Sequence, residues 1–312
     1  MKVAVLGTGF GSVHVQKYCK FLPSQNIFVW GRNKEKVQNL KDSLNINTVN
    51  SFDDIWNNDS IDLVDICLPN SLHKEIAIKA MKSGKHVYIE TPIAETLEDA
   101  NAILEVAKET GKKAFVDLFM RFEYAYDFLF RKMQEGNLGQ LKALYVKRDT
   151  PPWWGNLDLS EIGIQLIIHD VDFICRMMGE PNDIKISSVT VRQNESILSV
   201  LMQYKNSYAV LSSSSAMPGA HPFTIGYEAI FEKGTIRYSE DGYEENRKDA
   251  KLSMFTDKER LVFPLESIDC CEQAIKHVLD CCEKNITIIN PAEDAALALK
   301  TVLRMNEEIK IS

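Results

Sequence analysis

Long apolar runs are missing from this 312-residue chain, and no stretch approaches the roughly 20 residues that span a bilayer. An excess of positive charge is missing as well, because 44 Asp and Glu outnumber 36 Lys and Arg to give a net charge of −8. Nucleic acids and anionic membrane surfaces require clustered positive charge, so we expect neither as a partner. With 45% hydrophobic and 26% charged residues, the composition is typical of a soluble globular protein, and the length predicts two domains.

Cysteine is not arranged as a disulfide framework. The seven cysteines fit a reducing compartment, so we expect a cytoplasmic protein. Four of them form two adjacent pairs, Cys270–Cys271 and Cys281–Cys282, on one predicted helix. About 16 Å of helix would separate the pairs, which is too far for one zinc ion. We therefore expect buried or half-buried thiols and no metal site.

A glycine turn opens the chain. Lys2–Leu6 reads as a buried strand, and Gly7, Gly9 and Gly11 follow it before a predicted helix. Glycine lets the backbone turn tightly and approach a ligand, and a helix N-terminus favours an anion. This arrangement indicates a dinucleotide pyrophosphate site. The fingerprint G-x-G-x-x-G is imperfect because Ser12 occupies its third glycine position. A plain strand–helix turn is the alternative.

An acidic residue is missing after the second predicted strand, Asn26–Trp30, where Gly31, Arg32 and Asn33 follow instead. An acid at this place holds the ribose hydroxyls of NAD, whereas an arginine accommodates the 2′-phosphate of NADP. The sequence therefore predicts NADP, with NAD as the second choice. The alternative is that Arg32 is a solvated loop charge.

Strands and helices alternate over roughly the first 120 residues, which predicts a Rossmann domain with a doubly wound parallel sheet over residues 1–120. Residues 121–312 are predicted to form an α+β domain with a large, mainly antiparallel open sheet, and the last helix could pack back on the first domain. Within it we expect one helix over Ser160–Met178, a solvated loop or interrupted strand over Glu240–Ala250, and two closing helices.

Polar residues line one face of the helix expected over Ser160–Met178. Gln165, His169, Asp172 and Arg176 follow each other at spacings of four, three and four residues, among apolar neighbours. His169 has the one side chain there whose reference pKa, about 6.5, suits acid–base work near neutrality. The alternatives are a structural histidine and a structural Asp172–Arg176 pair.

Four stretches together resemble the Gfo/Idh/MocA family of glucose–fructose oxidoreductase and inositol dehydrogenase. They are GTGFGSVH from Gly7, LPNSLHKEIAIKAMKSGKHVYIETP from Leu68, MRF from Met120, and IHDVDFICRMMG from Ile168. The resemblance covers roughly residues 1–180. It implies a nicotinamide cofactor, hydride transfer to or from a sugar, polyol or related alcohol or ketone, and a homodimer or homotetramer built through the open sheet.

Two residues depart from the family pattern. The family usually has Glu-Lys-Pro where this chain has Glu90-Thr91-Pro92, and commonly an acid where this chain has Gln165. Two groups that usually serve proton transfer are thus neutral, and His169 is kept. We expect an NAD(P)-dependent oxidoreductase with His169, Gln165 and Thr91 as its catalytic residues. The alternatives are an NADP-binding redox sensor or regulator, and an enzyme that retains its cofactor while catalysing another reaction.

The residues expected to bind the cofactor come from the glycine turn, the ends of the following strands and one aromatic loop. They are Gly7, Gly9, Phe10, Gly11, Gly31, Arg32, Asn33, Leu68, Pro69, Asn70, His73, Glu90, Thr91 and Trp154.

Overall fold

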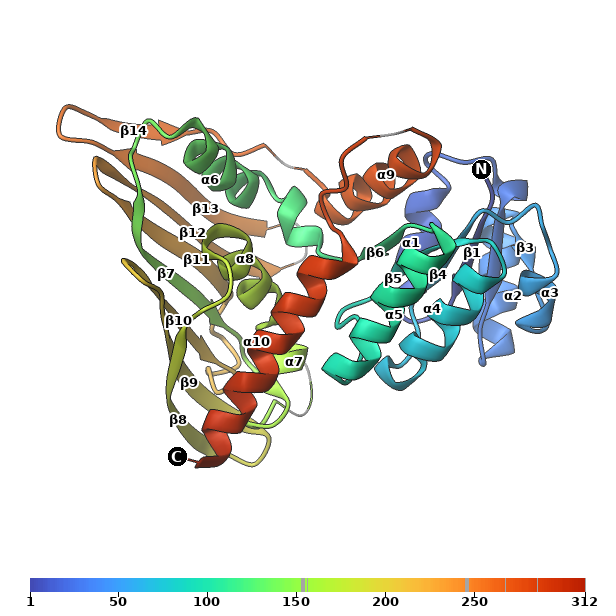
Figure 1. Ribbon diagram of the computed structural model, residues 1–312, viewed down its shortest axis with the longest axis horizontal. Coiled ribbons are helices and arrows are strands. Elements are labelled where there is room, and N and C mark those ends of the chain that lie inside the picture. The colour runs from blue at the N-terminus through green and yellow to red at the C-terminus, as the bar shows by residue number, and fades with distance from the viewer. Residues whose placement is uncertain (153–154, 156, 245–246, 267, 285, 312) are drawn as a thin grey trace. The chain divides into compact units, whose positions relative to one another are not determined.

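A computed structural model describes residues 1–152, 155, 157–244, 247–266, 268–284 and 286–311 (Figure 1). The chain forms two compact units. The first contains Met1–Phe122 and Asp269–Leu299, and the second contains Glu123–Ile268 and Lys300–Ser312. The division expected from the sequence, residues 1–120 and 121–312, differs chiefly in segment 269–299, which groups with the N-terminal residues.

The first unit is built on a six-stranded parallel sheet in the order β3-β2-β1-β4-β5-β6. Its strands are β1 (Val3–Leu6), β2 (Ile27–Trp30), β3 (Asn47–Thr48), β4 (Leu63–Ile66), β5 (His86–Ile89) and β6 (Ala114–Val116). Its α-helices are α1 (Gly11–Tyr18), α2 (Lys34–Leu44), α3 (Asp53–Trp56), α4 (His73–Lys82), α5 (Leu97–Thr110) and α9 (Cys270–Glu283), with short 3₁₀ turns η1 (Ser24–Asn26), η2 (Asn70–Leu72) and η3 (Phe119–Phe122). Helix α10 (Ala292–Ile311) begins in this unit and ends in the second.

The core of this unit explains why its strands read as continuous apolar runs. All residues of β1 and β4 are buried, as expected for parallel strands with both faces covered. Helix α9 adds Ile275, Val278 and Leu279 to the same core. Helices α4 and α5 lie side by side (Figure 1). The predicted Rossmann architecture is confirmed.

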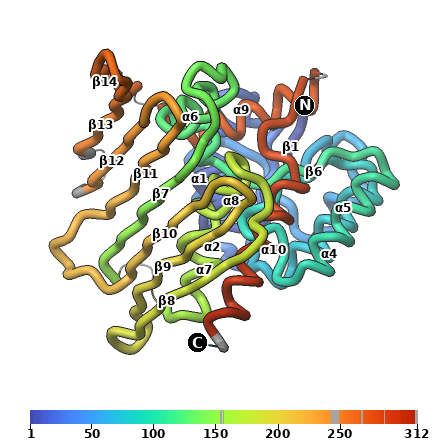
Figure 2. Tube along the Cα trace, turned by 60° about the vertical axis from the view of Figure 1, so that its left-hand side comes forward, coloured from blue at the N-terminus to red at the C-terminus, as the bar shows by residue number. Residues whose placement is uncertain are grey.

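The second unit is built on an eight-stranded sheet in the order β14-β13-β12-β11-β7-β10-β9-β8, which Figure 2 traces from one edge to the other. The strands are β7 (Leu141–Asp149), β8 (Asp183–Arg192), β9 (Glu195–Gln203), β10 (Tyr208–Ser214), β11 (Phe223–Phe231), β12 (Gly234–Glu244), β13 (Arg247–Phe255) and β14 (Arg260–Phe263). The helices are α6 (Tyr124–Glu135), α7 (Ile162–Gln165) and α8 (Ile168–Met178). Only β7 and β10 pair in parallel, so the mainly antiparallel sheet is confirmed.

Aromatic rings join helices α6 and α8 to one face of this sheet. The ring of Tyr126 meets those of Phe173, Tyr227 and Tyr238 edge to face, with centroids 4.7, 5.5 and 5.9 Å away. Such contacts add to the apolar area that the rings bury. Along β7 the alternate residues Tyr145 and Lys147 are exposed, as expected for a sheet with one covered face.

One predicted element is wrong in detail. The single helix expected over residues 160–178 is interrupted, because the buried residues Leu166 and Ile167 separate α7 from α8. For Glu240–Ala250 the described residues favour the second of the two expectations, an interrupted strand, since 240–244 belong to β12 and 247–250 to β13. Within the described residues, no helix is long and apolar enough to cross a membrane.

Candidate functional site: a glycine-lined cavity at the strand ends

Gly7 turns the chain sharply after β1. Its φ of +118° suits glycine, and a Cβ atom there would lie 2.1 Å from the carbonyl oxygen of Cys67, so no other residue fits without movement. A Cβ atom at Gly9 would meet nothing within 4 Å. The turn therefore presents bare backbone on an open side, where a ligand can approach it closely.

A cavity of about 290 Å³ lies at the carboxyl ends of β1, β2 and β4, the edge of a parallel sheet where ligands bind. It is lined by Gly7, Thr8, Gly9, Trp30, Arg32, Asn33, Lys36, Cys67, Leu68 and Pro69. Six of these residues were predicted from the sequence. Thr8, Trp30, Lys36 and Cys67 were not, although each adjoins a predicted residue or, for Lys36, lies one helical turn beyond Asn33.

The lining is cationic. It contains Arg32 and Lys36, and none of the described lining residues is acidic. Asn33 caps α2, because its side-chain oxygen accepts a hydrogen bond of 3.0 Å from the backbone N–H of Lys36. This cap fixes the first turn of α2, so both cations lie beside the same cavity. They favour an anionic group there.

The loop after β2 lies directly against the glycine turn. A Cβ atom at Gly31 would be 2.7 Å from the methyl carbon of Thr8. A Cβ atom at Gly11 would be 3.2 Å from side-chain carbons of Cys67 and Val5. Gly31 and Gly11, both predicted to contact the cofactor, therefore act in the structure as close-packing positions outside the cavity lining.

Other predicted cofactor residues lie outside the lining too. The ring of Phe10 is 69% exposed at the start of α1, and Asn70 begins η2. Trp154 lies outside the described residues. Thr91 is half-buried and follows Glu90, whose carboxylate accepts a hydrogen bond of 3.2 Å from its backbone N–H. The bond between Thr91 and Pro92 is cis.

His73 is buried and bridges two strand-end loops. Its ring nitrogens lie 2.9 Å from the carbonyl oxygens of Pro92 and Leu68. Burial lowers the pKa of His73, so at neutral pH the ring carries one N–H and donates to one of the two carbonyls. His73 thus holds Leu68, which lines the cavity, and its own contact with the cofactor stays a prediction.

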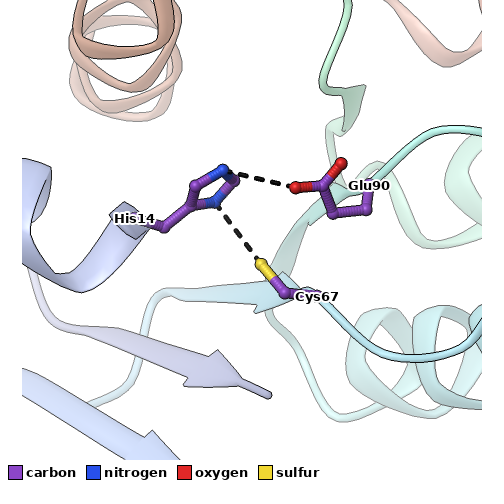
Figure 3. Close-up of side chains that lie close together, drawn as sticks. All are labelled: His14, Cys67 and Glu90. Carbon is purple, nitrogen blue, oxygen red and sulfur yellow. Dashed lines mark hydrogen bonds and ion pairs between the residues drawn. The ribbon is translucent and has the colours of Figure 1, made fainter. Parts of the chain in front are cut away.

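A buried polar cluster lies behind the glycine turn (Figure 3). We call it the His14 cluster, and it contains His14, Asp65, Cys67, Glu90 and Asp117. His14 Nδ1 is 2.9 Å from Asp65 Oδ2, and its Nε2 is 3.4 Å from Glu90 Oε1 and 3.6 Å from Asp117 Oδ2. Cys67 Sγ donates to Asp65 Oδ1 over 3.2 Å. Glu90, predicted as a cofactor residue, thus points toward His14.

Burial and neighbouring charges shift the pKa values of groups in the His14 cluster. Burial, reinforced by the charge of Asp117, raises the pKa of Glu90 to about 8, although His14 opposes the shift. Burial lowers the pKa of His14, but the charges of Asp65 and Cys67 and the hydrogen bonds to Asp117 and Asp65 together outweigh it, so the pKa of His14 is raised. Tyr88 Oη donates to Asp117 Oδ1 over 2.5 Å. This cluster was not predicted, because its members come from α1, the ends of β4 and β5, and the residue after β6.

The proposed catalytic residues of the second unit lie on either side of the helix break. His169, in the first turn of α8, is half-buried. Gln165, the last residue of α7, is exposed and donates to Glu161 Oε2 over 2.6 Å. The break places Leu166 and Ile167 between them, so the regular helical spacing inferred from the sequence does not hold for this pair.

A buried ion pair holds α8 to the sheet. Arg148 of β7 and Asp170 form this pair in bidentate geometry, with Nε 2.5 Å from Oδ2 and Nη2 3.1 Å from Oδ1. Arg176 places its guanidinium carbon 3.8 Å from the ring centroid of Phe130, and its pairing with Asp172 stays a prediction. Asp170 was missed because the predicted polar stripe skipped its position.

Comparison with known proteins agrees with the Rossmann architecture of the first unit. Residues 1–118 match the model of the GFO_IDH_MocA oxidoreductase family, described as having an NAD-binding Rossmann fold. The N-terminal 118 residues are thus similar to the Gfo/Idh/MocA family. The scyllo-inositol 2-dehydrogenase (NAD⁺) of Bacillus subtilis is 29% identical over 187 residues, which are 57% of this chain and 54% of that protein. The 2,7-anhydro-N-acetylneuraminate hydratase of Escherichia coli is 26% identical over 183 residues, which are 56% of this chain and 49% of that protein.

A solved structure extends the likeness of fold to the whole chain. The UDP-N-acetylglucosamine 3-dehydrogenase of Acidithiobacillus ferrooxidans superposes with a TM-score of 0.84 at 21% identity, covering 99% of this chain and 97% of that one. In sequence, the chain spans only about half the length of the curated relatives it matches.

Proposed function

We propose that this chain is an NADP-dependent oxidoreductase that transfers hydride between the nicotinamide and a carbonyl or alcohol of a sugar, polyol or related small molecule. The observation that carries the proposal is the cavity in which the glycine turn meets Arg32 and Lys36. The scyllo-inositol 2-dehydrogenase of Bacillus subtilis, similar over 54% of its length, supports the reaction class.

The residues of the cavity fit a dinucleotide with a 2′-phosphate. Gly7 and Gly9 leave room for a diphosphate beside the N-terminus of α1, where the helix dipole favours negative charge. Arg32 and Lys36 would hold the 2′-phosphate, since an arginine fork donates to phosphate oxygens in pairs. When bound, the cofactor supplies the hydride donor or acceptor.

The proton in such a reaction needs a group on the protein. We propose His169 for this role, because an imidazole exchanges a proton near neutral pH. Gln165 and the Thr91 hydroxyl can orient a substrate hydroxyl by hydrogen bonds, but neither can act as a base at neutral pH. Because Thr91 and Gln165 stand where the family has a lysine and an acid, His169 is the residue that we propose to transfer the proton.

Those two neutral residues also favour a second candidate. An enzyme that retains its cofactor through a non-redox reaction needs different proton chemistry from a dehydrogenase, and the relative from Escherichia coli is named a hydratase. An NADP-binding redox sensor is the remaining alternative. A mass spectrum of the purified protein would reveal a retained nucleotide, and absence of turnover with tight binding would favour the sensor.

Calorimetric titration with NADPH and NADH tests cofactor choice. We expect tighter binding of NADPH in the native chain, and a loss of about tenfold or more in Arg32→Ala for NADPH alone, equivalent to about 1.4 kcal/mol. The matched control is Lys34→Ala, an exposed lysine two residues away that does not line the cavity. Tighter binding of NADH would refute the NADP assignment.

Turnover is tested by screening sugar and polyol substrates while the absorbance of the reduced nicotinamide is followed. With an active substrate, His169→Ala should lower kcat at least about 100-fold, the contribution typical of a general acid or base. Turnover retained within a few-fold would remove His169 from the mechanism.

We also propose a homodimer or homotetramer that covers the outer face of the eight-stranded sheet. Apolar side chains on this sheet are exposed in the single chain, among them Val189 (61%), Ile197 (41%) and Tyr208 (38%). Exposed apolar area of this kind favours association. Light scattering after size-exclusion chromatography should give a multiple of 35.4 kDa, and a monomer would contradict the proposal.

A further inference from the structure

The His14 cluster is not explained by dinucleotide binding. Of its members only Cys67 lines the cavity. The other side chains lie behind the glycine turn; His14 and Asp65 are 3% and 0% exposed, and the Glu90 side chain is 17% exposed. Burying several ionisable groups together is costly unless they are paired or bind an ion.

The carboxyl groups of the cluster outnumber its one basic group. Three carboxyl groups, those of Asp65, Glu90 and Asp117, surround one imidazole. In the part of the chain that the structure describes, His14 is the only ion-pair partner of Asp65 and of Glu90. A bound cation would stabilise the ionised form of these carboxyl groups.

The orientation of the His14 ring suits a metal ligand. Its Nδ1 lies 2.9 Å from Asp65 Oδ2, and a proton on Nδ1 must be donated in this contact because a carboxylate only accepts. In the neutral ring that a metal ion binds, the lone pair of Nε2 would then face Glu90 and Asp117. A carboxylate that holds the far nitrogen of a histidine is the usual outer partner of a metal-bound imidazole.

The spacing around Nε2 matches a coordination shell better than a set of hydrogen bonds. Nε2 lies 3.4 Å from Glu90 Oε1 and 3.6 Å from Asp117 Oδ2, beyond the usual 2.7–3.2 Å of an N–H···O bond. Nitrogen and oxygen ligands bound at about 2.0–2.2 Å in a tetrahedron lie about 3.4 Å apart. Both distances from Nε2 to a carboxylate oxygen are therefore close to the distance between two ligands of one ion.

We propose that the His14 cluster binds one divalent metal ion through His14 Nε2 and carboxylate oxygens of Glu90 and Asp117, with Asp65 holding the imidazole in place. Cys67 lies at the edge of this site, since its Sγ, a ring nitrogen of His14 and a carboxylate oxygen of Glu90 all lie within 4.8 Å of one another (Figure 3). A mixed nitrogen, carboxylate and sulfur environment favours Zn²⁺ over Mg²⁺ or Ca²⁺. This proposal differs from our expectation from sequence that the chain binds no metal.

The site would communicate with the dinucleotide cavity. Cys67 belongs to both, and a Cβ atom at either Gly7 or Gly11 would contact it. An ion that fixes the side chains around Cys67 therefore changes one wall of the cavity. By linkage, the ion and the dinucleotide then alter each other's affinity by the same factor.

The test titrates the chelator-treated full chain with Zn²⁺ by calorimetry and with Co²⁺ by visible absorption. We expect one ion per chain and the intense d–d bands of low-coordinate Co²⁺. Glu90→Gln, which keeps the side-chain shape, should weaken binding at least about 100-fold, and Asp65→Asn should weaken it about 10–100-fold as an outer partner. No stoichiometric binding by the native chain would overturn the proposal.

A control variant separates this site from the other described contact between a histidine and a cysteine. Cys281 Sγ lies 3.2 Å from His277 Nε2 on α9, so Cys281→Ser should leave the titration unchanged. Loss of the bands in Cys281→Ser, with retention in Glu90→Gln, would place the metal elsewhere and refute the site.

X-ray absorption of the Zn²⁺-loaded native chain tests the ligands without any variant. The proposed site requires nitrogen and oxygen at about 2.0–2.2 Å with the outer-shell scattering of an imidazole. A shell made of sulfur alone would refute it. None of these readouts requires a substrate or dinucleotide, so failure here leaves the proposed function standing.

Discussion

Arg148 and Asp170 join β7 to α8 through two parallel hydrogen bonds inside the second unit, where Asp170 is 0% and Arg148 6% exposed. Removing one partner of a buried ion pair leaves the other charge buried without a partner, which typically costs about 3–5 kcal/mol. We predict that Asp170→Ala lowers the free energy of unfolding by about 3 kcal/mol or more, measured by urea denaturation.

The double variant Arg148→Met/Asp170→Leu is the informative control for this pair. It removes both charges while keeping most of the volume, so it should be less destabilised than Asp170→Ala. If the double variant loses the sum of the two single effects, the pair does not act as a unit.

The glycine turn gives a second prediction. Gly7→Ala must displace the Cys67 carbonyl and adopt a strained backbone, so it should lose about 3 kcal/mol or more of stability. Gly9→Ala meets no neighbour and should change the unfolding free energy by less than about 1 kcal/mol. Its new methyl group would nevertheless enter the space open to a ligand, so NADPH affinity should fall about tenfold or more. Unchanged affinity in Gly9→Ala would argue against a ligand on this side of the turn.

Replacement of His73 should lower both the free energy of unfolding and the affinity for NADPH. His73→Leu removes the ring N–H, which donates to the carbonyl oxygen of either Leu68 or Pro92, and an unsatisfied buried polar group costs about 1–3 kcal/mol. Because Leu68 lines the cavity, we also expect weaker NADPH binding by calorimetry. His221→Leu, at a half-buried loop position of the second unit, is the control and should leave NADPH binding unchanged.

His86 should make stability depend on pH. Its Nδ1 accepts a hydrogen bond of 2.9 Å from the backbone N–H of Lys113, which requires the neutral ring. Burial, helped by the charges of Lys112 and Lys113, lowers the pKa of His86 to about 4, against about 6.5 in an unfolded chain. Between these values the unfolded state binds the extra proton, so this contribution to stability falls as the pH drops from 6.5 to 4.

His86→Asn isolates that effect, because an amide oxygen can accept the same hydrogen bond without titrating. The unfolding free energy of the variant, from urea melts at several pH values, should fall less steeply than that of the native chain between pH 6.5 and 4. Parallel curves would show that His86 does not titrate in this range.

The parallel unit was predictable because its signals are local. Buried strands such as Val3–Leu6 read as unbroken apolar runs, and Gly7 and Gly9 follow directly in the chain. Arg32 and Asn33 could be placed at the cavity for the same reason, since the end of a parallel strand fixes where the next residues lie.

What the sequence left unpredicted depends on contacts between distant segments. Asp65 and Asp117 lie 52 residues apart in the chain, and both carboxylates lie beside His14. Neither residue at the break, Leu166 or Ile167, is a glycine or proline that would indicate the end of a helix. The predicted helix was therefore continued through it. Asp170 was missed because its partner, Arg148, lies on a strand of the sheet.

The close contact of Gly31 with Thr8 has a practical consequence. It couples the two loops through their main chains and small groups, while the side chains of Arg32 and Lys36 remain exposed beside the cavity. We therefore expect that substitutions at positions 32 and 36 alone can change the preference between NADPH and NADH. The backbone of the two loops that positions these side chains should stay unchanged.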